Sequence, residues 1–211
     1  MIYIIGGPPR GGKTTLASAL GGQLGIPYFT MDHVASVIAP YIPETDYADK
    51  LPLRVARQAT QYSNDSFYAT YATPAIVDFY VRQAITYWPG VREFISYALA
   101  DEHELILEGW QLLPHLVNDV ITPKERNRAR VVFLYKHDVP AIVAGLRAGT
   151  RHDDWVIRNT KREETFASIA RMLALFGDQV RDGAEAAGFE AINTDHQFDA
   201  RLEAILNQWS R

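Results

Sequence analysis

Short apolar runs separated by longer amphipathic stretches are the main pattern along this chain. The runs at 2–5, 105–107 and 131–134 show no polar alternation and have the length of strands. Unbroken apolar runs are typical of parallel strands that are covered on both faces. The pattern therefore predicts five strands, over 2–5, 28–31, 104–109, 129–135 and 188–193.

Helical patterns fill the intervals between these runs. We expect helices over 14–24, through most of 33–101, up to about 187 after a polar stretch at 138–165, and over 196–211. Prolines punctuate 33–101, and Pro89-Gly90 is expected to interrupt it. Alternating strands and helices predict one α/β domain over 1–211, a three-layer doubly wound sandwich with a five-stranded parallel sheet. Ligands of such sheets bind beyond the carboxyl ends of the strands.

A phosphate-binding motif lies between the first predicted strand and helix. Gly7, four residues and then Gly12-Lys13-Thr14 satisfy G-x-x-x-x-G-K-[ST]. Its glycines let backbone N–H groups point at phosphate oxygens, and the next helix adds its positive end. Lys13 is expected to bridge the β- and γ-phosphates of ATP, and Thr14 to bind Mg²⁺. The other loop residues expected to bind the nucleotide are Arg10, Gly11 and Thr15.

Two acidic residues follow predicted strands at the same edge of the sheet. Asp32 comes directly after the second strand, where a carboxylate can accept or orient the proton of an acceptor hydroxyl, and it is also a candidate N-cap. Glu108 ends the third strand, where a carboxylate can hold Mg²⁺ through water. His33, beside Asp32, is a weaker candidate, because an isolated histidine near a cleft is often structural.

Four arginines after the fourth strand are spaced by four, seven and four residues: Arg147, Arg151, Arg158 and Arg162. One continuous helix would align them in a stripe. Gly149 and the polar residues 152–154 make two helices joined by a break equally consistent with the sequence. In both cases 138–165 is expected to form a lid that closes on the transferred phosphoryl group. Arg147 and Arg151 are the predicted catalytic pair, and the other interpretation is a solvated face paired with nearby acidic residues.

Composition narrows the class of protein. The formal net charge of −4 argues against a general nucleic-acid binder, and the lack of cysteine excludes disulfides and thiolate metal sites. No apolar run approaches the length of a membrane span, so a cytoplasmic protein is expected. Sixteen of the 21 cationic residues are arginine, the side chain suited to bidentate phosphate contacts.

The order of these motifs resembles the small P-loop kinases of the nucleoside-monophosphate-kinase-like group. Residues 107–114, Leu-Glu-Gly-Trp-Gln-Leu-Leu-Pro, are similar to a Glu-Gly-x-x-x-x-Pro segment of 2-phosphoglycerate-kinase-like proteins. The resemblance implies a P-loop NTPase fold and transfer of phosphate from ATP, with Mg²⁺, to a small acceptor. The Asp-Gly-[Phe/Tyr]-Pro-Arg segment usual in nucleoside monophosphate kinases is replaced here by 108–112, which argues against a nucleotide acceptor.

These observations predict an ATP-dependent kinase that phosphorylates a hydroxyl group of a small metabolite. Region 33–101 is expected to bind the acceptor, and an anionic acceptor is expected if arginines converge there. A nucleoside monophosphate kinase and a regulator that binds ATP without transferring phosphate are the alternatives. The acceptor-binding candidates are Arg54, Arg57, Arg82 and Gln111.

Overall fold

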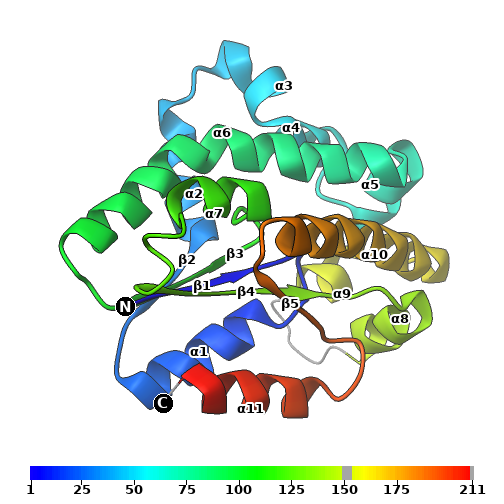
Figure 1. The fold of residues 1–211 in the computed structure, drawn as a ribbon. Helices are drawn as coiled ribbons and strands as arrows, with labels where there is room; N and C mark the ends of the chain where they lie inside the picture. Colours follow the sequence, from blue (N-terminus) through cyan, green and yellow to red (C-terminus); the bar gives the residue numbers. More distant parts are fainter. Residues whose placement is uncertain (149–153, 210–211) are drawn as a thin grey trace.

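The fold is built on a five-stranded sheet in which every pair of neighbouring strands is parallel. A computed structural model describes residues 1–148 and 154–209, with the strand order β2-β3-β1-β4-β5. The predicted three-layer α/β fold is confirmed, because helices cover both faces of this sheet (Figure 1). The strands are β1 (Ile2–Gly6), β2 (Tyr28–Thr30), β3 (Leu105–Gly109), β4 (Ala129–Tyr135) and β5 (Glu190–Asn193).

Alternate residues of the central strands enter two separate hydrophobic cores. In β1, Ile2 and Ile4 join the larger core, while Tyr3 and Ile5 join the smaller one. In the same way Phe133 of β4 enters the larger core and Leu134 enters the smaller. Successive side chains of a strand point to opposite faces, so a strand buried on both faces has to be apolar at every position.

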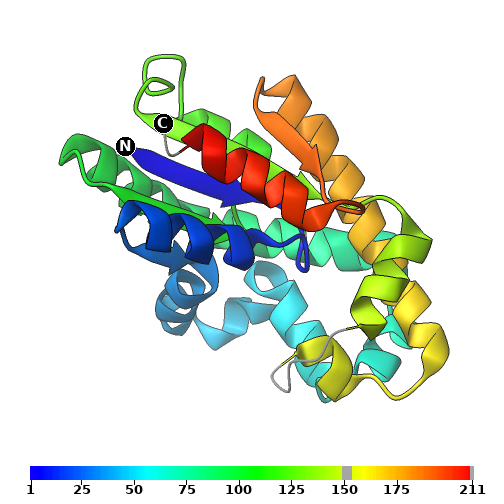
Figure 2. The same ribbon diagram turned by 90° about the horizontal axis from the view of Figure 1, so that it is seen from below.

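Two helices cover one face of the sheet and a thicker helical layer covers the other (Figures 1 and 2). The first pair is α1 (Lys13–Leu24) and α11 (Phe198–Trp209). The opposite layer contains α6 (Thr73–Ala100), α7 (Pro114–Val120) and α10 (Glu163–Ala186). Short helices pack outside α6 and α10: α2 (Met31–Ile38), η1 (Ala39–Tyr41), η2 (Glu44–Asp46), α3 (Tyr47–Lys50), α4 (Pro52–Ala59) and α5 (Asn64–Thr70).

The segment after β4 lies beyond the carboxyl end of the sheet (Figure 1). It contains α8 (Val139–Arg147), then α9 (Trp155–Asn159), before α10 begins at Glu163. Of the two arrangements compatible with the arginine spacing, the interrupted one is therefore present. The phosphate loop leaves β1 at this same end of the sheet, so α8 and α9 are placed to contact it.

Two local predictions were wrong. Pro89-Gly90 does not interrupt the helical region, because α6 runs unbroken over 28 residues with Pro89 inside it. The helix after β2 begins at Met31, so Asp32 lies in its first turn and Thr30 occupies the N-cap position. Proline in a long helix is tolerated where packing compensates, and Trp88 and Val91 beside it are buried.

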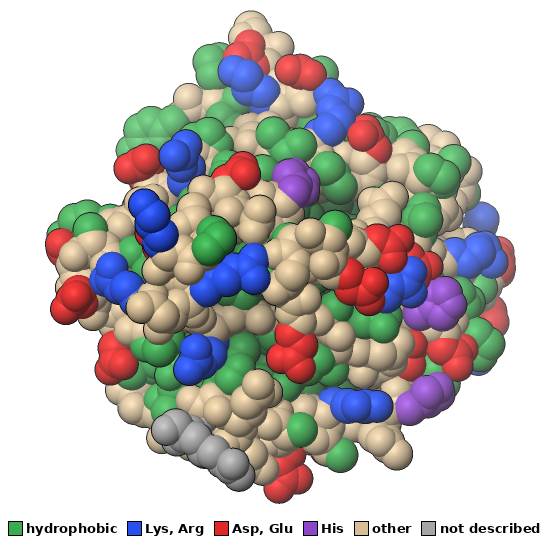
Figure 3. Space-filling view, in the orientation of Figure 1, with side chains coloured by type: hydrophobic (Ala, Val, Ile, Leu, Met, Phe, Trp, Pro, Cys, Tyr) green, Lys and Arg blue, Asp and Glu red, His purple; other side chains and the backbone are tan. Residues whose placement is uncertain are grey.

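Acidic and basic side chains are interspersed over the face of the molecule seen in Figure 3. Neither sign forms a continuous patch on that face. Within the described ranges, none of the helices combines the length and the apolar character that crossing a bilayer requires.

Candidate active site

The loop between β1 and α1 takes a conformation that requires glycine at two positions. Gly7 has φ of 130°, and a Cβ there would lie 2.0 Å from the carbonyl oxygen of Leu134 in β4. Gly12 has φ of 95°, and a Cβ there would lie 2.3 Å from a ring carbon of Phe198. The first turn of α1 carries no acidic side chain. Its positive end therefore faces the loop without an acidic side chain from α1 itself.

Lys13 is buried at the base of this loop. Lys13 is only 7% exposed, and its Nζ donates a hydrogen bond of 2.7 Å to the carbonyl oxygen of Pro8. Burial lowers the pKa of Lys13 below its ordinary value of 10.5, while the charges of Glu108 and Asp32 act in the opposite direction. An anion bound in the loop would satisfy the ammonium group better than a single carbonyl does.

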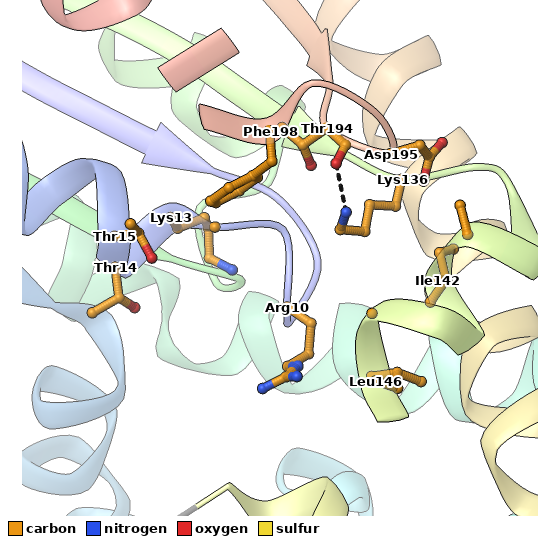
Figure 4. Close-up of a pocket in the computed structure, with 13 residues that line it drawn as sticks. Arg10, Lys13, Thr14, Thr15, Lys136, Ile142, Leu146, Thr194, Asp195 and Phe198 are labelled. Carbon is orange, nitrogen blue, oxygen red and sulfur yellow. Dashed lines mark hydrogen bonds between the residues drawn. The ribbon is translucent and has the colours of Figure 1, made fainter. Parts of the chain in front are cut away.

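A cavity of about 540 Å³ opens on one side of the loop, and we call it the loop cavity. Figure 4 shows Lys13 and Phe198 on one side of it, with Ile142 and Leu146 of α8 across from them. Lys136 Nζ donates to the carbonyl oxygen of Thr194 at 2.6 Å, which ties the end of β4 to the end of β5. The lining residues are Arg10, Gly12, Lys13, Thr14, Thr15, Lys136, Ala141, Ile142, Gly145, Leu146, Thr194, Asp195 and Phe198.

Glu108 and Thr14 meet at a second cavity of about 510 Å³, the central cavity. Thr14 Oγ1 donates to Glu108 Oε1 at 3.2 Å, although the two residues are 94 positions apart. Parallel pairing of β1 with β3 sets Glu108 beside Ile5, at the point where the loop begins. Glu108 is only 3% exposed. A hydroxyl and a buried carboxylate are the hard oxygen donors that Mg²⁺ accepts alongside water and phosphate oxygens.

Asp32 lines the central cavity, together with His33. One of its carboxylate oxygens, Oδ1, accepts hydrogen bonds from Gln111 Nε2 at 2.8 Å and from Trp110 Nε1 at 3.0 Å. Asp32 itself is exposed, whereas Gln111 is buried. The carboxylate is therefore held in place from the turn that follows β3.

A third cavity, of about 330 Å³, lies beyond Asp32. Four of its ten lining residues are aromatic, so we call it the aromatic cavity. Four residues line both it and the central cavity, which places Asp32 where the two spaces meet: Pro9, Asp32, Trp110 and Trp155. The remaining lining residues are Leu53, Arg57, Tyr62, Tyr80, Arg158 and Asn159.

Of the arginines expected to bind the acceptor, Arg57 alone lines this cavity among the described residues. Its guanidinium lies 3.9 Å from the ring centre of Phe67 and 5.2 Å from that of Trp155. Asn64 accepts from Arg57 Nη1 at 2.7 Å and donates to the carbonyl oxygen of Trp155 at 3.2 Å. Asn64 thereby connects α4 with α9.

The other candidates from region 33–101 have different partners. Arg82 pairs with Asp49 at 2.8 Å on the surface, and the Arg54 guanidinium lies over the ring of Tyr47. In the wall of the aromatic cavity, burial raises the pKa of the Tyr80 phenol, so its hydroxyl group stays protonated. Gln111 contacts Asp32, not the aromatic cavity.

The predicted lid arginines are dispersed. Arg147 forms an exposed ion pair with Glu163 across the α8–α10 boundary, which is the solvated pairing that the sequence left open. Arg151 lies outside the described residues. Arg158 of α9 lines the aromatic cavity, and Arg162 precedes α10, where its backbone N–H donates to Asp65.

A link between the phosphate loop and α9 was not expected from the sequence. Arg10, with φ of 66°, forms an ion pair with Asp154, whose side chain is 2% exposed. Asp154 also caps α9 by accepting from the backbone N–H of Val156 at 3.0 Å. Arg10 is thus held toward α9.

Some residues of the site were not predicted from the sequence: Lys136, Asp154, Trp155 and Phe198. Among these four, Lys136 alone has a feature in the sequence that could have indicated it, because it directly follows β4.

Comparison with solved structures finds proteins of similar overall shape at low sequence identity. No protein-family model matches the sequence, and no curated protein matches it. A shikimate kinase from Bacteroides thetaiotaomicron has a TM-score of 0.47 at 15% identity, over 99% of this chain and 96% of that one.

Two further solved structures have similar scores. An uncharacterized protein from Eubacterium ventriosum has a TM-score of 0.48 at 14% identity, over 100% of this chain and 99% of that one. The deoxyadenosine kinase of M. mycoides, solved with bound dATP, has a TM-score of 0.46 at 13% identity, over 100% of both chains. Such values do not identify a relative, so the chemistry has to be read from the side chains of this site.

Proposed function

We propose that this protein is a kinase that transfers the γ-phosphoryl group of ATP to a hydroxyl group of a small anionic metabolite. The observation that carries the proposal is that each of the three cavities shares lining residues with the next. Arg10, Lys13 and Thr14 line both the loop cavity and the central cavity. Asp32 lines both the central and the aromatic cavity. A phosphoryl donor and an acceptor could therefore meet between Lys13 and Asp32.

The loop cavity would hold the nucleotide. Its apolar wall from α8 and Phe198 suits a flat base, while the loop and Lys13 suit the phosphates. Thr14 and Glu108 would hold Mg²⁺, which supplies charge neutralisation to the phosphates when bound. Their direct hydrogen bond already brings the two oxygen donors together.

The aromatic cavity would hold the acceptor. Aromatic walls favour a molecule with a ring or another flat apolar part. Arg57 and Arg158 favour an anionic group on the same molecule, because a guanidinium pairs with carboxylate or phosphate. Arg147 is paired with Glu163, so its predicted catalytic role would require that pair to open.

The reaction would be an in-line transfer. The acceptor oxygen forms a bond to the γ-phosphorus while the bond from that phosphorus to the β,γ-bridging oxygen breaks, and ADP leaves with the bond electrons. The hydroxyl proton passes to Asp32 and then to solvent. Lys13 stabilises the negative charge that develops on the phosphoryl oxygens.

Calorimetry and a transfer screen test the proposal. The protein should bind ATP or GTP with Mg²⁺, and it should produce ADP or GDP with at least one acceptor from a panel of anionic alcohols. Transfer to the phosphate of a nucleoside monophosphate would favour the alternative kinase. Lys13→Ala should reduce transfer by about 10³-fold without changing the circular dichroism spectrum. Lys124→Ala, at an exposed position, is the matched control. Absence of binding for both nucleotides would refute the proposal.

A further inference from the structure

The carboxylate of Asp32 is held through one of its two oxygens. Both hydrogen bonds, from Gln111 Nε2 at 2.8 Å and from Trp110 Nε1 at 3.0 Å, end on Oδ1. Among residues 1–148 and 154–209, none donates a hydrogen bond to Oδ2. Among the described residues, this asymmetry leaves the other oxygen of an exposed carboxylate without a hydrogen-bond donor at the junction of the central and aromatic cavities.

Both donors are fixed by their own surroundings and not by Asp32. The indole of Trp110 packs edge-on against Tyr80 of α6, with ring centres 5.0 Å apart at 89°. Gln111 is 1% exposed, in the turn between β3 and α7. Gly109 lies close beneath it, since a Cβ there would be 2.7 Å from Gln111 Oε1. The two N–H groups therefore form a rigid pair.

Gln111 has a feature that packing alone does not account for. Its amide oxygen Oε1 is buried and has no hydrogen-bond partner among the described residues. An unpaired buried carbonyl destabilises a protein by about 1–3 kcal/mol. An apolar side chain of similar size would avoid that cost, so the amide at this position serves its N–H contact with Asp32.

We infer that Trp110 and Gln111 are positioning residues for the transfer step, an inference that rests on the proposed function. By holding Oδ1, they fix the rotation of the Asp32 carboxylate and present Oδ2 to the acceptor hydroxyl. Without them, a carboxylate in the exposed first turn of α2 would rotate freely and could turn toward the ammonium group of Lys13, which its charge already influences. A displacement of about 1 Å at a reacting group can reduce a rate about 100-fold.

Gln111→Leu is the most direct test, because it removes the donor and the unpaired oxygen together. We expect the melting temperature to stay the same or to rise, and kcat to fall about tenfold to 100-fold with the KM for ATP unchanged. The probe is Mg-ATP turnover with water as acceptor and with any acceptor found in the screen. Trp110→Phe, which retains the ring packed on Tyr80, should also lower kcat selectively.

Gln83→Leu is the matched control. Gln83 is a second buried glutamine, and its Oε1 accepts from the backbone N–H of Arg54 at 3.0 Å, away from the three cavities. It should lower the melting temperature and leave kcat unchanged. If Gln111→Leu instead resembled Gln83→Leu, with lost stability and full turnover, the positioning role would be refuted.

Nuclear magnetic resonance provides a readout that does not depend on activity. In ¹⁵N-labelled protein, the indole N–H signal of Trp110 is assigned by its loss in Trp110→Phe. Asp32→Asn should move this signal upfield, and it should leave the signals of Trp88 and Trp209 in place. An unmoved signal would refute the contact. If the signal moves in Asp32→Asn but the wild-type protein turns over no Mg-ATP with any acceptor, the contact stands, and both its catalytic role and the proposed function are refuted.

Discussion

The phosphate loop and the aromatic cavity lie on either side of Asp32, and they are built in opposite ways. The loop consists of consecutive residues whose backbone is proposed to bind phosphate, together with Lys13 and Thr14, and it has glycine at positive φ at positions 7 and 12. The aromatic cavity consists mainly of side chains from α4, α6, α9 and the two turns after α4 and β3, with Pro9 of the loop and Asp32 at its edge, and its lining residues extend from Pro9 to Asn159.

The two regions therefore depend on the amino-acid sequence in different ways. A backbone site tolerates changes of neighbouring side chains but not a Cβ at the wrong position. A side-chain site tolerates backbone variation but depends on each charged or aromatic group that lines it. Substitutions in the two regions should therefore have different effects. Those in the loop should change stability and nucleotide binding, and those in the aromatic cavity should change acceptor binding.

The largest effect is expected from Gly7→Ala. The new Cβ would lie 2.0 Å from the backbone oxygen of Leu134, at a φ of 130° that alanine rarely adopts. We expect a loss of at least about 2 kcal/mol of unfolding free energy and loss of ATP binding. Gly22→Ala, where nothing lies within 4 Å, should stabilise α1 by about 0.5–1 kcal/mol. Chemical denaturation measures both, and equal effects would contradict the backbone interpretation.

A smaller and more selective effect is expected from Arg57→Leu. Loss of one charge-assisted hydrogen bond costs about 1.5–3 kcal/mol, so the KM for an anionic acceptor should rise about tenfold to 100-fold while ATP binding is retained. Arg57→Lys should recover part of the loss, because the cation is kept. Arg82→Leu, at a surface pair with Asp49, is the control and should behave as wild type. An unchanged KM in Arg57→Leu would remove Arg57 from the acceptor site.

The smallest effect is a pH dependence of ATP binding. Burial lowers the pKa of Lys13 below 10.5, and bound phosphates would raise it again because negative charge favours the ammonium form. Binding is therefore strongest below the pKa of free Lys13, and it weakens as the pH rises through that value, with proton uptake on binding.

Calorimetry in buffers of different ionisation enthalpy measures this proton uptake. Lys13→Arg, which stays charged throughout the range, should show none of it. Equal uptake in the two proteins would assign the titration to another group.

Most of the fold was predictable because its signals are local. Short apolar runs located all five strands, with β4 predicted at both ends. The phosphate loop was predictable for the same reason, since strand, glycine motif and helix are contiguous. Asp32 and Glu108 could be named because the ends of parallel strands meet at one edge of the sheet.

The acceptor side was predicted less well. Arg54, Arg57 and Arg82 are equivalent by sequence, yet Arg57 alone of the three lines the aromatic cavity. Gln111 was a candidate for acceptor binding, and in the structure its amide N–H donates to Asp32. The partners of Arg10 and Arg147, which are Asp154 and Glu163, depend on how α8, α9 and α10 pack.

By itself, the sequence determined the α/β alternation, the position of the phosphate loop and the edge of the sheet where chemistry can occur. Apolar runs and glycine conformation act over a few residues, and parallel pairing brings the carboxyl ends of the strands to one edge of the sheet. The tertiary structure alone decided which arginine faces a cavity, which donors hold Asp32 and which carboxylate pairs with the loop. Those contacts join residues as far as 144 positions apart, and they form only when separate helices pack against one another.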